Sequence, residues 1–123
     1  DDPRLIVVES LGPRYPRTLA TADVVVGNSS SGVIEAASVG VPAIDIGERQ
    51  AGRLRGANVL HADEGRDGVA AQLPLALSTP FSVSSRTAQN PYGDGDAALR
   101  ILDVVLATPG VRRTKPFNDS RTP

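Results

Sequence analysis

The stretch VVVGNSSSGVIEAASVGVPAIDIG, residues 24–47, is the most informative part of the sequence about the fold. It contains an apolar run that ends at Gly27, a polar turn, a helical pattern and a second apolar run. Gly40 and Pro42 are the residues expected to end the helix between the two runs. Continuous β-branched runs are typical of parallel strands that are covered on both faces. The stretch therefore predicts a strand–helix–strand unit with a right-handed crossover.

The same alternation continues along the chain and predicts an α/β fold. We expect a Rossmann-like parallel sheet with helices on both faces, and at least one sheet edge that something outside this chain covers. Residues 1–110 are expected to form a partial domain and residues 111–123 a polar tail. Pro74 is expected to end or kink the helix in which it lies. The predicted strands are 4–9, 23–27, 42–47 and 57–62; the helical stretches are 11–22, 31–40, 65–78 and 96–108; the loops are 48–56 and 80–95.

Composition excludes several classes of function. The 123 residues carry a net charge of −1, which argues against non-specific nucleic-acid binding. The absence of Cys and the single His exclude thiolate and multi-His metal sites, and we expect no cofactor. No apolar run approaches the roughly 20 residues that cross a bilayer, so we expect a cytoplasmic protein with no membrane partner. The abrupt start DDPRLIVVES suggests a fragment.

The polar turn that follows Gly27 is the first candidate site. Ligands of open parallel sheets bind beyond the carboxyl ends of the strands, where this turn opens a helix. The first helical turn offers unpaired N–H groups and a partial positive charge, which favour a phosphate. Gly27 and Gly32 allow close approach, and the polar residues Asn28, Ser29 and Ser30 flank the bound anion. The alternative is that Ser30 or Ser31 merely caps the helix.

Glu35 extends this prediction to a nucleotide. It lies four residues after Ser31, on nearly the same face of the helix, whereas a capping box would place the acid three residues after the cap. A carboxylate in this position can accept hydrogen bonds from the hydroxyls of a ribose, as in other nucleotide-binding folds. The alternative is a solvated helix carboxylate.

Other polar groups give weaker signals. Arg49 follows the third predicted strand closely and suits a phosphate, whereas Arg53 and Arg55 are interpreted as solvated loop residues. His61 has no evident partner and is interpreted as structural. The segment NPYGDGDA, residues 90–97, is interpreted as a turn in which Asp94 or Asp96 caps the next helix.

Together these motifs carry a family resemblance that spans nearly the whole chain. Residues 27–61, GNSSSGVIEAASVGVPAIDIGERQAGRLRGANVLH, resemble the UDP-N-acetylglucosamine 2-epimerases. The part IGERQAGR is closest to the hydrolysing branch of that family. NPYGDGDAALRIL, residues 90–102, is similar to the segment that opens the last helices of the family, and KPFNDS, residues 115–120, is similar to its tail.

The resemblance implies an enzyme with two Rossmann-like domains of the GT-B type and an active site between them. This chain would be the UDP-binding C-terminal part, with an N-terminal domain, UDP and UDP-N-acetylglucosamine as its partners and a homo-oligomer as an open alternative. Ser29 and Ser30 would contact the diphosphate, Glu35 the ribose and Arg49 the nucleotide site, while Tyr15 would lie near the uracil. The family eliminates UDP and then adds water with inversion at C2, to give N-acetylmannosamine.

The resemblance assigns no catalytic residue to this chain. The proton-transfer groups of the family lie in segments that match nothing here, and His61 does not occupy the family's His motif. Two other readings stay open: half of a GT-B glycosyltransferase, and a non-catalytic module that binds UDP-sugars.

Overall fold

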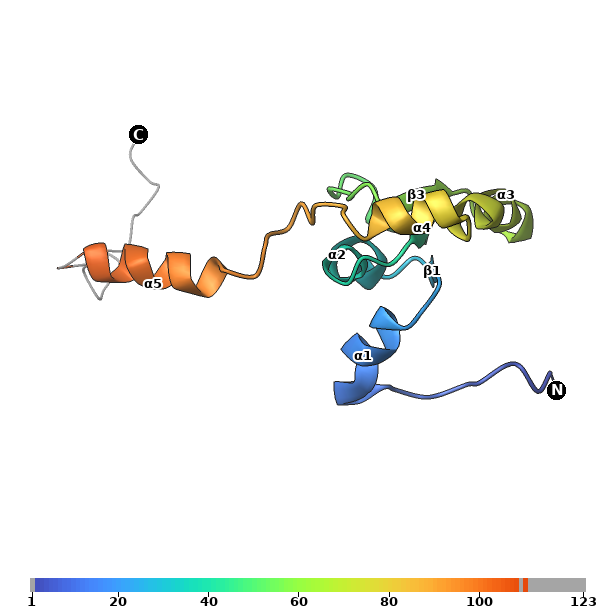
Figure 1. Ribbon diagram of the computed structural model, residues 1–123, viewed down its shortest axis with the longest axis horizontal. Helices are drawn as coiled ribbons and strands as arrows, with labels where there is room; N and C mark the ends of the chain where they lie inside the picture. The colour runs from blue at the N-terminus through green and yellow to red at the C-terminus, as the bar shows by residue number, and fades with distance from the viewer. Residues whose placement is uncertain (1, 109, 111–123) are drawn as a thin grey trace, which may run out of the picture. The chain divides into compact units, whose positions relative to one another are not determined.

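The computed structural model describes residues 2–108 and residue 110 (Figure 1). Contacts between residues divide the chain into two compact units, Asp1–Tyr92 and Gly93–Pro123, and each is described by itself. The predicted tail, residues 111–123, lies outside the described residues.

The first unit is built on a parallel sheet, as predicted. Its strands are β1 (Val25–Gly27), β2 (Ala43–Ile46) and β3 (Val59–Ala62), in the order β1-β2-β3. The central strand β2 is parallel to both neighbours, and Asp45 is opposite Gly27 on one side and His61 on the other. Because all three strands run the same way, their carboxyl ends meet at one edge, which is where ligands bind in such sheets.

Among the described residues, the first unit contains six helical segments besides the sheet, and the second unit contains a seventh. They are η1 (Gly12–Arg14), α1 (Tyr15–Ala20), α2 (Ser30–Ser38), η2 (Glu48–Gln50), α3 (Arg66–Ala76), α4 (Thr79–Ser85) and, in the second unit, α5 (Ala97–Ala107).

Helices α2 and α3 cover opposite faces of the sheet. A methyl group placed on Gly32 of α2 would lie 3.9 Å from the Cβ of Ala43, so Ala43 faces α2. The next residue of β2, Ile44, packs with Ala62 and with Ala76 of α3. Since successive side chains of a strand point to opposite faces, the two helices lie on either side. The predicted Rossmann-like arrangement is confirmed.

The predicted strand at residues 4–9 is wrong. Residues 5–8 form no strand, and their side chains, Leu5 to Val8, are 53–84% exposed. A β-branched run forms a strand only where another strand supplies hydrogen-bond partners, and none of the described strands lies beside this one. The described sheet consequently has three strands, one fewer than expected.

Two predictions about the helices are also corrected. The segment 80–95 was expected to be a loop, but α4 occupies its beginning. Ser78 caps α4 by accepting a hydrogen bond from the amide of Phe81 at 3.4 Å, and Pro80 lies in the first turn, where proline fits a helix. Of the two outcomes expected at Pro74, an end of the helix is wrong, because α3 continues to Ala76, and a kink stays a prediction. A proline lacks one N–H donor but leaves the hydrogen bonds that the other residues donate in place.

The second unit contains the predicted amphipathic helix. None of the residues of α5 is buried, although it carries six exposed large apolar side chains: Leu99, Ile101, Leu102, Val104, Val105 and Leu106. Asp96 is the N-cap residue, but its side chain makes no capping hydrogen bond. Asp94 instead accepts hydrogen bonds from Arg100, which hold the pKa of Asp94 well below its usual range. Among the described residues, no helix has the length and apolar character needed to traverse a lipid bilayer.

Candidate functional site

The serine turn connects the end of β1 to the start of α2, as the sequence predicts. Ser29 has extended backbone angles and is the N-cap residue, and its Oγ accepts a hydrogen bond from the amide of Ser31 at 3.3 Å. The expectation that Ser30 or Ser31 caps the helix is therefore wrong by one or two positions. Ser30 and Ser31 already have helical geometry, and a cap must lie outside the helix.

Two backbone amides of this turn remain available to a ligand. Gly32 donates its amide to the carbonyl of Ser29 at 3.1 Å, whereas the amides of Ser29 and Ser30 donate to no acceptor in the part of the chain that the structure describes. They lie at the positive end of the nine-residue helix α2. Unpaired N–H groups at a helix N-terminus favour the binding of an anion.

The loop after β2 reaches back to the serine turn. Gly47 has φ 65°, a left-handed conformation, and a side chain there would meet Glu64 at 2.6 Å. This bend places η2 beside Asn28, whose side-chain oxygen accepts a 3.4 Å hydrogen bond from Arg49. The structure thus brings Arg49 to the predicted site.

Gln50 is a site residue that the sequence analysis missed. Its buried side chain donates a hydrogen bond from Nε2 to the main-chain oxygen of Asn28, at 2.7 Å. Residues 48–56 read as a polar loop, and nothing in a single sequence shows that one amide of that loop turns inward. The adjacent helical turn Glu48–Gln50 was not predicted either.

Arg55 is also more than a solvated loop residue. Its Nη2 lies 2.7 Å from Oδ2 of Asp45, a carboxylate buried in the central strand, and its Nε lies 3.1 Å from the same oxygen. A buried carboxylate is costly without a hydrogen-bonded partner, so Asp45 anchors this part of the loop to the sheet. The signal available in the sequence was an aspartate within an otherwise apolar strand.

Tyr15 and Glu35 flank the turn on the side of α1 and α2. The hydroxyl of Tyr15 is hydrogen-bonded to Oγ of Ser31, which brings the predicted aromatic ring to the serine turn. Glu35 is exposed and lies one helical turn beyond Ser31, on nearly the same face of α2. It makes no hydrogen bond within the described residues, so its carboxylate is available to solvent or to a ligand.

The segment predicted as a turn at residues 90–97 also supports the site. Asn90 donates to the carbonyl of Ile34 at 2.9 Å and to Oγ of Ser38 at 2.6 Å, which fixes the far end of α2. The hydroxyl of Tyr92 donates to the carbonyl of Leu54 at 3.1 Å. Through these two side chains, the segment that follows α4 holds both α2 and the loop after β2.

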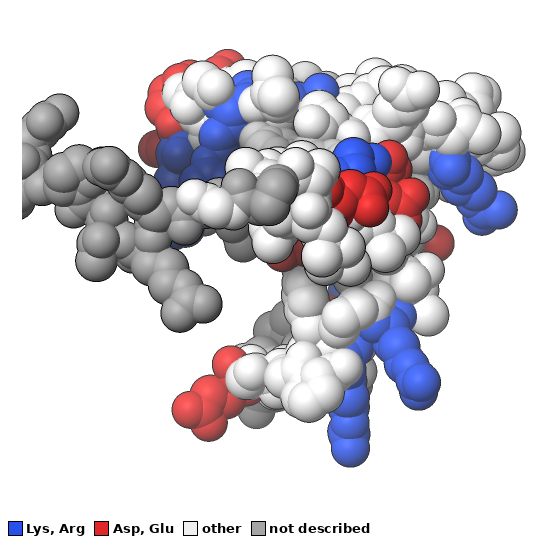
Figure 2. All heavy atoms as spheres, turned by 90° about the vertical axis from the view of Figure 1, so that its left-hand side faces the viewer, with Lys and Arg blue, Asp and Glu red and all other residues white. Residues whose placement is uncertain are grey.

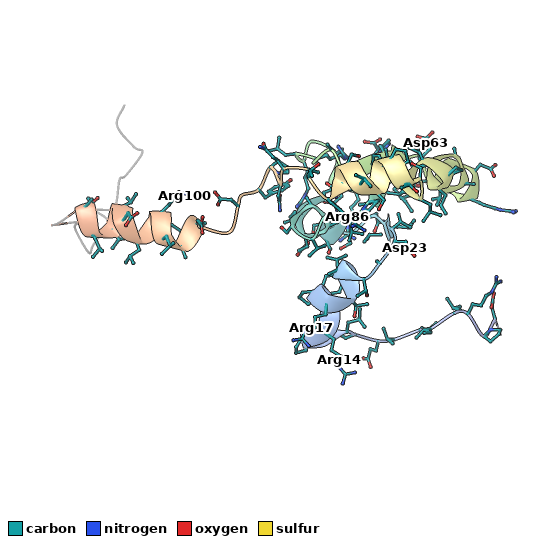
Figure 3. All side chains as sticks on the ribbon, viewed as in Figure 1. Arg14, Arg17, Asp23, Asp63, Arg86 and Arg100 are labelled. Atoms are coloured by element: carbon teal, nitrogen blue, oxygen red, sulfur yellow. The ribbon has the colours of Figure 1, made fainter. Side chains whose placement is uncertain are left out.

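A hollow of about 280 Å³ lies at the end of the sheet opposite the serine turn. Asp23 and Arg86, both labelled in Figure 3, line it together with Val39 and Gly40 at the C-terminus of α2. A helix C-terminus carries partial negative charge and does not favour an anion. The two ends of α2 therefore differ, and only the serine turn suits a phosphate.

The described residues contain no candidate metal centre, and the face shown in Figure 2 carries no large basic patch. The described residues contain no group of three or more His, Cys, Asp or Glu side chains that could hold a metal ion. In the view of Figure 2, positive and negative side chains form small separate groups on a largely uncharged surface. His61 is exposed on β3, and its Nε2 lies 3.9 Å from a carboxylate oxygen of Glu48.

Comparison with known proteins identifies the family of this sequence. The sequence profile of the UDP-N-acetylglucosamine 2-epimerases matches residues 2–106. The chain belongs to this family. The match includes the serine turn, Glu35 and the loop that carries Arg49, so the candidate site lies within the segment that defines membership.

Individual members of the family match over shorter parts of their own length. The UDP-N,N'-diacetylbacillosamine 2-epimerase (hydrolyzing) of Legionella pneumophila is 36% identical over 110 residues, which cover 89% of this chain and 28% of that protein. The polysialic acid biosynthesis protein P7 of Escherichia coli is 32% identical over 65% of this chain and 20% of its own length. The GDP/UDP-N,N'-diacetylbacillosamine 2-epimerase (hydrolyzing) of Campylobacter jejuni is 40% identical over 50 residues, 41% of this chain and 13% of its own length. The chain thus spans less than a third of these relatives.

Proposed function

We propose that this chain is the UDP-binding C-terminal part of a hydrolysing UDP-N-acetylglucosamine 2-epimerase of the GT-B type. The complete enzyme converts UDP-N-acetylglucosamine to N-acetylmannosamine and UDP, by eliminating UDP and then adding water with inversion at C2. One observation carries the proposal: the unpaired amides of Ser29 and Ser30 lie at the N-terminus of α2, beside Arg49. Two relatives named as hydrolysing enzymes support the hydrolysing branch.

In this proposal the chain binds the leaving group. Negative charge builds up on the diphosphate as the bond between C1 and the phosphate oxygen breaks. Amides and hydroxyls of Ser29 and Ser30, the positive end of α2 and the guanidinium of Arg49 stabilise that charge. Gly32 lets the first turn of α2 lie close to Ala43 of β2, and Asn28 orients Arg49.

The remaining predicted residues bind the nucleoside. The carboxylate of Glu35 accepts hydrogen bonds from the ribose hydroxyls, and the ring of Tyr15 stacks near the uracil. The groups that transfer protons are supplied by an N-terminal Rossmann-like domain that closes over the site, and His61 takes no part. The enzyme acts in the cytoplasm, and a second copy of the chain is a candidate partner.

Product analysis tests the proposed reaction. Full-length protein incubated with UDP-N-acetylglucosamine, without any acceptor, is expected to release UDP and N-acetylmannosamine in equal amounts. UDP release that depends on an added sugar acceptor would instead identify a glycosyltransferase. UDP binding without turnover under either condition would identify a non-catalytic binding module.

Glu35→Gln tests the ribose assignment in the same protein. The variant keeps its shape but loses the charge-assisted hydrogen bonds, so we expect UDP affinity to fall by about 10-fold. Arg53→Ala is the matched control, because Arg53 is exposed and makes no side-chain hydrogen bond within the described residues. Equal UDP affinities of the two variants, measured by calorimetry, would remove Glu35 from the site.

A further inference from the structure

We propose that Gln50 is a positioning residue that orients the peptide between Asn28 and Ser29 for the diphosphate. The inference rests on the proposed function, because it concerns how the same turn binds the phosphates of UDP. Gln50 itself touches no ligand in this proposal. It acts through the backbone of the serine turn.

The geometry of one peptide group carries the inference. Nε2 of Gln50 donates to the main-chain oxygen of Asn28 at 2.7 Å, and Gln50 is only 3% exposed. The peptide that follows Asn28 is trans and planar, so its C=O and the N–H of Ser29 point in opposite directions. By holding the oxygen, Gln50 directs the Ser29 amide away from itself and toward the open side of the turn.

This peptide needs such an anchor because no regular structure holds it. The strand ladder of β1 ends at Gly27, and α2 begins at Ser30. Asn28 and Ser29 are both exposed, so water can also bond this peptide, but water does not fix its direction, whereas the buried side chain of Gln50 does. Without Gln50, rotation of the peptide plane would turn the Asn28 oxygen toward the ligand and its negative end would repel a phosphate.

Gln50 is itself fixed to the central strand. Nη2 of Arg55 donates to the main-chain oxygen of Gln50 at 3.3 Å while it pairs with the buried carboxylate of Asp45. Asp45 is opposite Gly27 in the sheet, one residue before Asn28. Two adjacent strand ends are thereby connected through side chains, so the orientation of the phosphate turn depends on a polar chain of contacts that begins within β2.

A purely structural role makes a different prediction from a positioning role. If the hydrogen bond only satisfies buried polar groups, its loss lowers stability and affects every ligand of the site alike. If it aims the Ser29 amide, its loss weakens ligands that carry phosphates and spares a nucleoside without them. UDP and uridine are such a pair, since they share the base and the ribose.

The test compares Gln50→Met with wild type in the full-length protein. Methionine keeps the length of the side chain but cannot donate a hydrogen bond. We expect UDP affinity to fall by about 10-fold, as for the loss of one hydrogen bond to an oriented group, and uridine affinity to change less than about 2-fold. UDP binding is measured by calorimetry and uridine binding by ligand-observed NMR. Gln72→Met on α3 is the matched control and leaves both affinities at the wild-type level.

Three results would overturn the inference, and one of them would also overturn the proposed function. An unchanged UDP affinity in Gln50→Met, or equal losses for UDP and uridine, removes the positioning role while the proposed function stands. A wild-type protein that binds no UDP removes the proposed function and this inference with it. If Gln50→Met does not fold, Gln50→Asn replaces it. Asparagine stays polar but is one methylene too short to reach the Asn28 oxygen, so the same selective loss of UDP affinity is expected.

Discussion

Two short apolar runs of the first unit have similar sequences but adopt different structures. The run LIVV, residues 5–8, and the run VVVG, residues 24–27, both consist of residues that favour strands. Val25 and Val26 pair with Ala43 and Ile44 of β2, and α2 packs beside them. The first run pairs with no described strand and exposes its side chains.

Whether such a run forms a strand therefore depends on its neighbours and not on its composition. A strand obtains its hydrogen bonds from a neighbour and its burial from whatever covers its faces. For residues 24–27 the following strand supplies the hydrogen bonds and α2 part of the burial, although Val26 stays 44% exposed. For residues 5–8 no described element does so. Matched substitutions in the two regions test this explanation.

The largest effect on stability is expected from shortening one isoleucine in each region. Ile44 is 1% exposed in β2, whereas Ile6 is 84% exposed. Ile44→Ala is expected to lower the free energy of unfolding by about 3 kcal/mol, while Ile6→Ala changes it by less than about 0.5 kcal/mol. Urea unfolding of the 123-residue chain measures both. An equally large loss for Ile6→Ala would mean that the first run is packed in solution.

An intermediate effect is expected from the ion pairs next to the runs. Arg55 pairs with the buried Asp45, whereas Arg4 pairs with the exposed Asp2. Arg55→Met leaves an unpaired buried carboxylate and is expected to cost about 2 kcal/mol, below the usual range for a buried pair because the Arg55 side chain is 30% exposed. Arg4→Met is expected to have no measurable effect.

The double variant Asp45→Asn with Arg55→Met checks the physical reason. Removing both charges takes away the unpaired carboxylate, so the free energy of unfolding is expected to recover part of the loss seen in Arg55→Met. A double variant that is less stable than the single one would show that the attraction of the pair, rather than the isolated charge, determines the cost.

The smallest effect concerns acid titration at the start of the first run. The hydrogen bond from Arg4 lowers the pKa of Asp2 from its ordinary 3.8. A lowered pKa means that the contact is fully present above pH 3.8 and is lost as the pH falls through the lowered value. In Arg4→Met we expect the pKa of Asp2 to return toward 3.8, as measured by carboxyl NMR. An identical pKa in both proteins would show that Arg4 is not bound to Asp2 in solution.

The part of the fold that could be predicted is the part specified locally. The run that ends at Gly27, the helix that stops before Gly40 and the strand after Pro42 carry their own start and stop signals. The structure bears them out as β1, α2 and β2. Helix α4 was missed because it is only seven residues long and rich in serine, so its periodicity is too short to recognise.

The sequence predicts where the candidate site lies, but not the hydrogen bonds that hold its loops in place. Strand ends and an N-terminal serine cluster were enough to bring Arg49 and Asn28 together, because parallel strands end at one edge. The inward turn of Gln50 and the pairing of Arg55 with Asp45 depend on the path of the loop after Gly47. That path is set by packing between elements distant in sequence, which residue patterns do not encode.

The close approach of α2 to the sheet has a consequence for the depth of the proposed anion site. Beneath the first turn of the helix lies only the methyl group of Ala43, and one more methyl on Gly32 would just touch it. Larger residues at these two positions would move the N-terminus of α2 away from the sheet. The polar residues of the serine turn would stay unchanged. In the proposed UDP site, the volume of the side chains at Gly32 and Ala43 would thus set the distance between α2 and the sheet, independently of the length of the loop after β2.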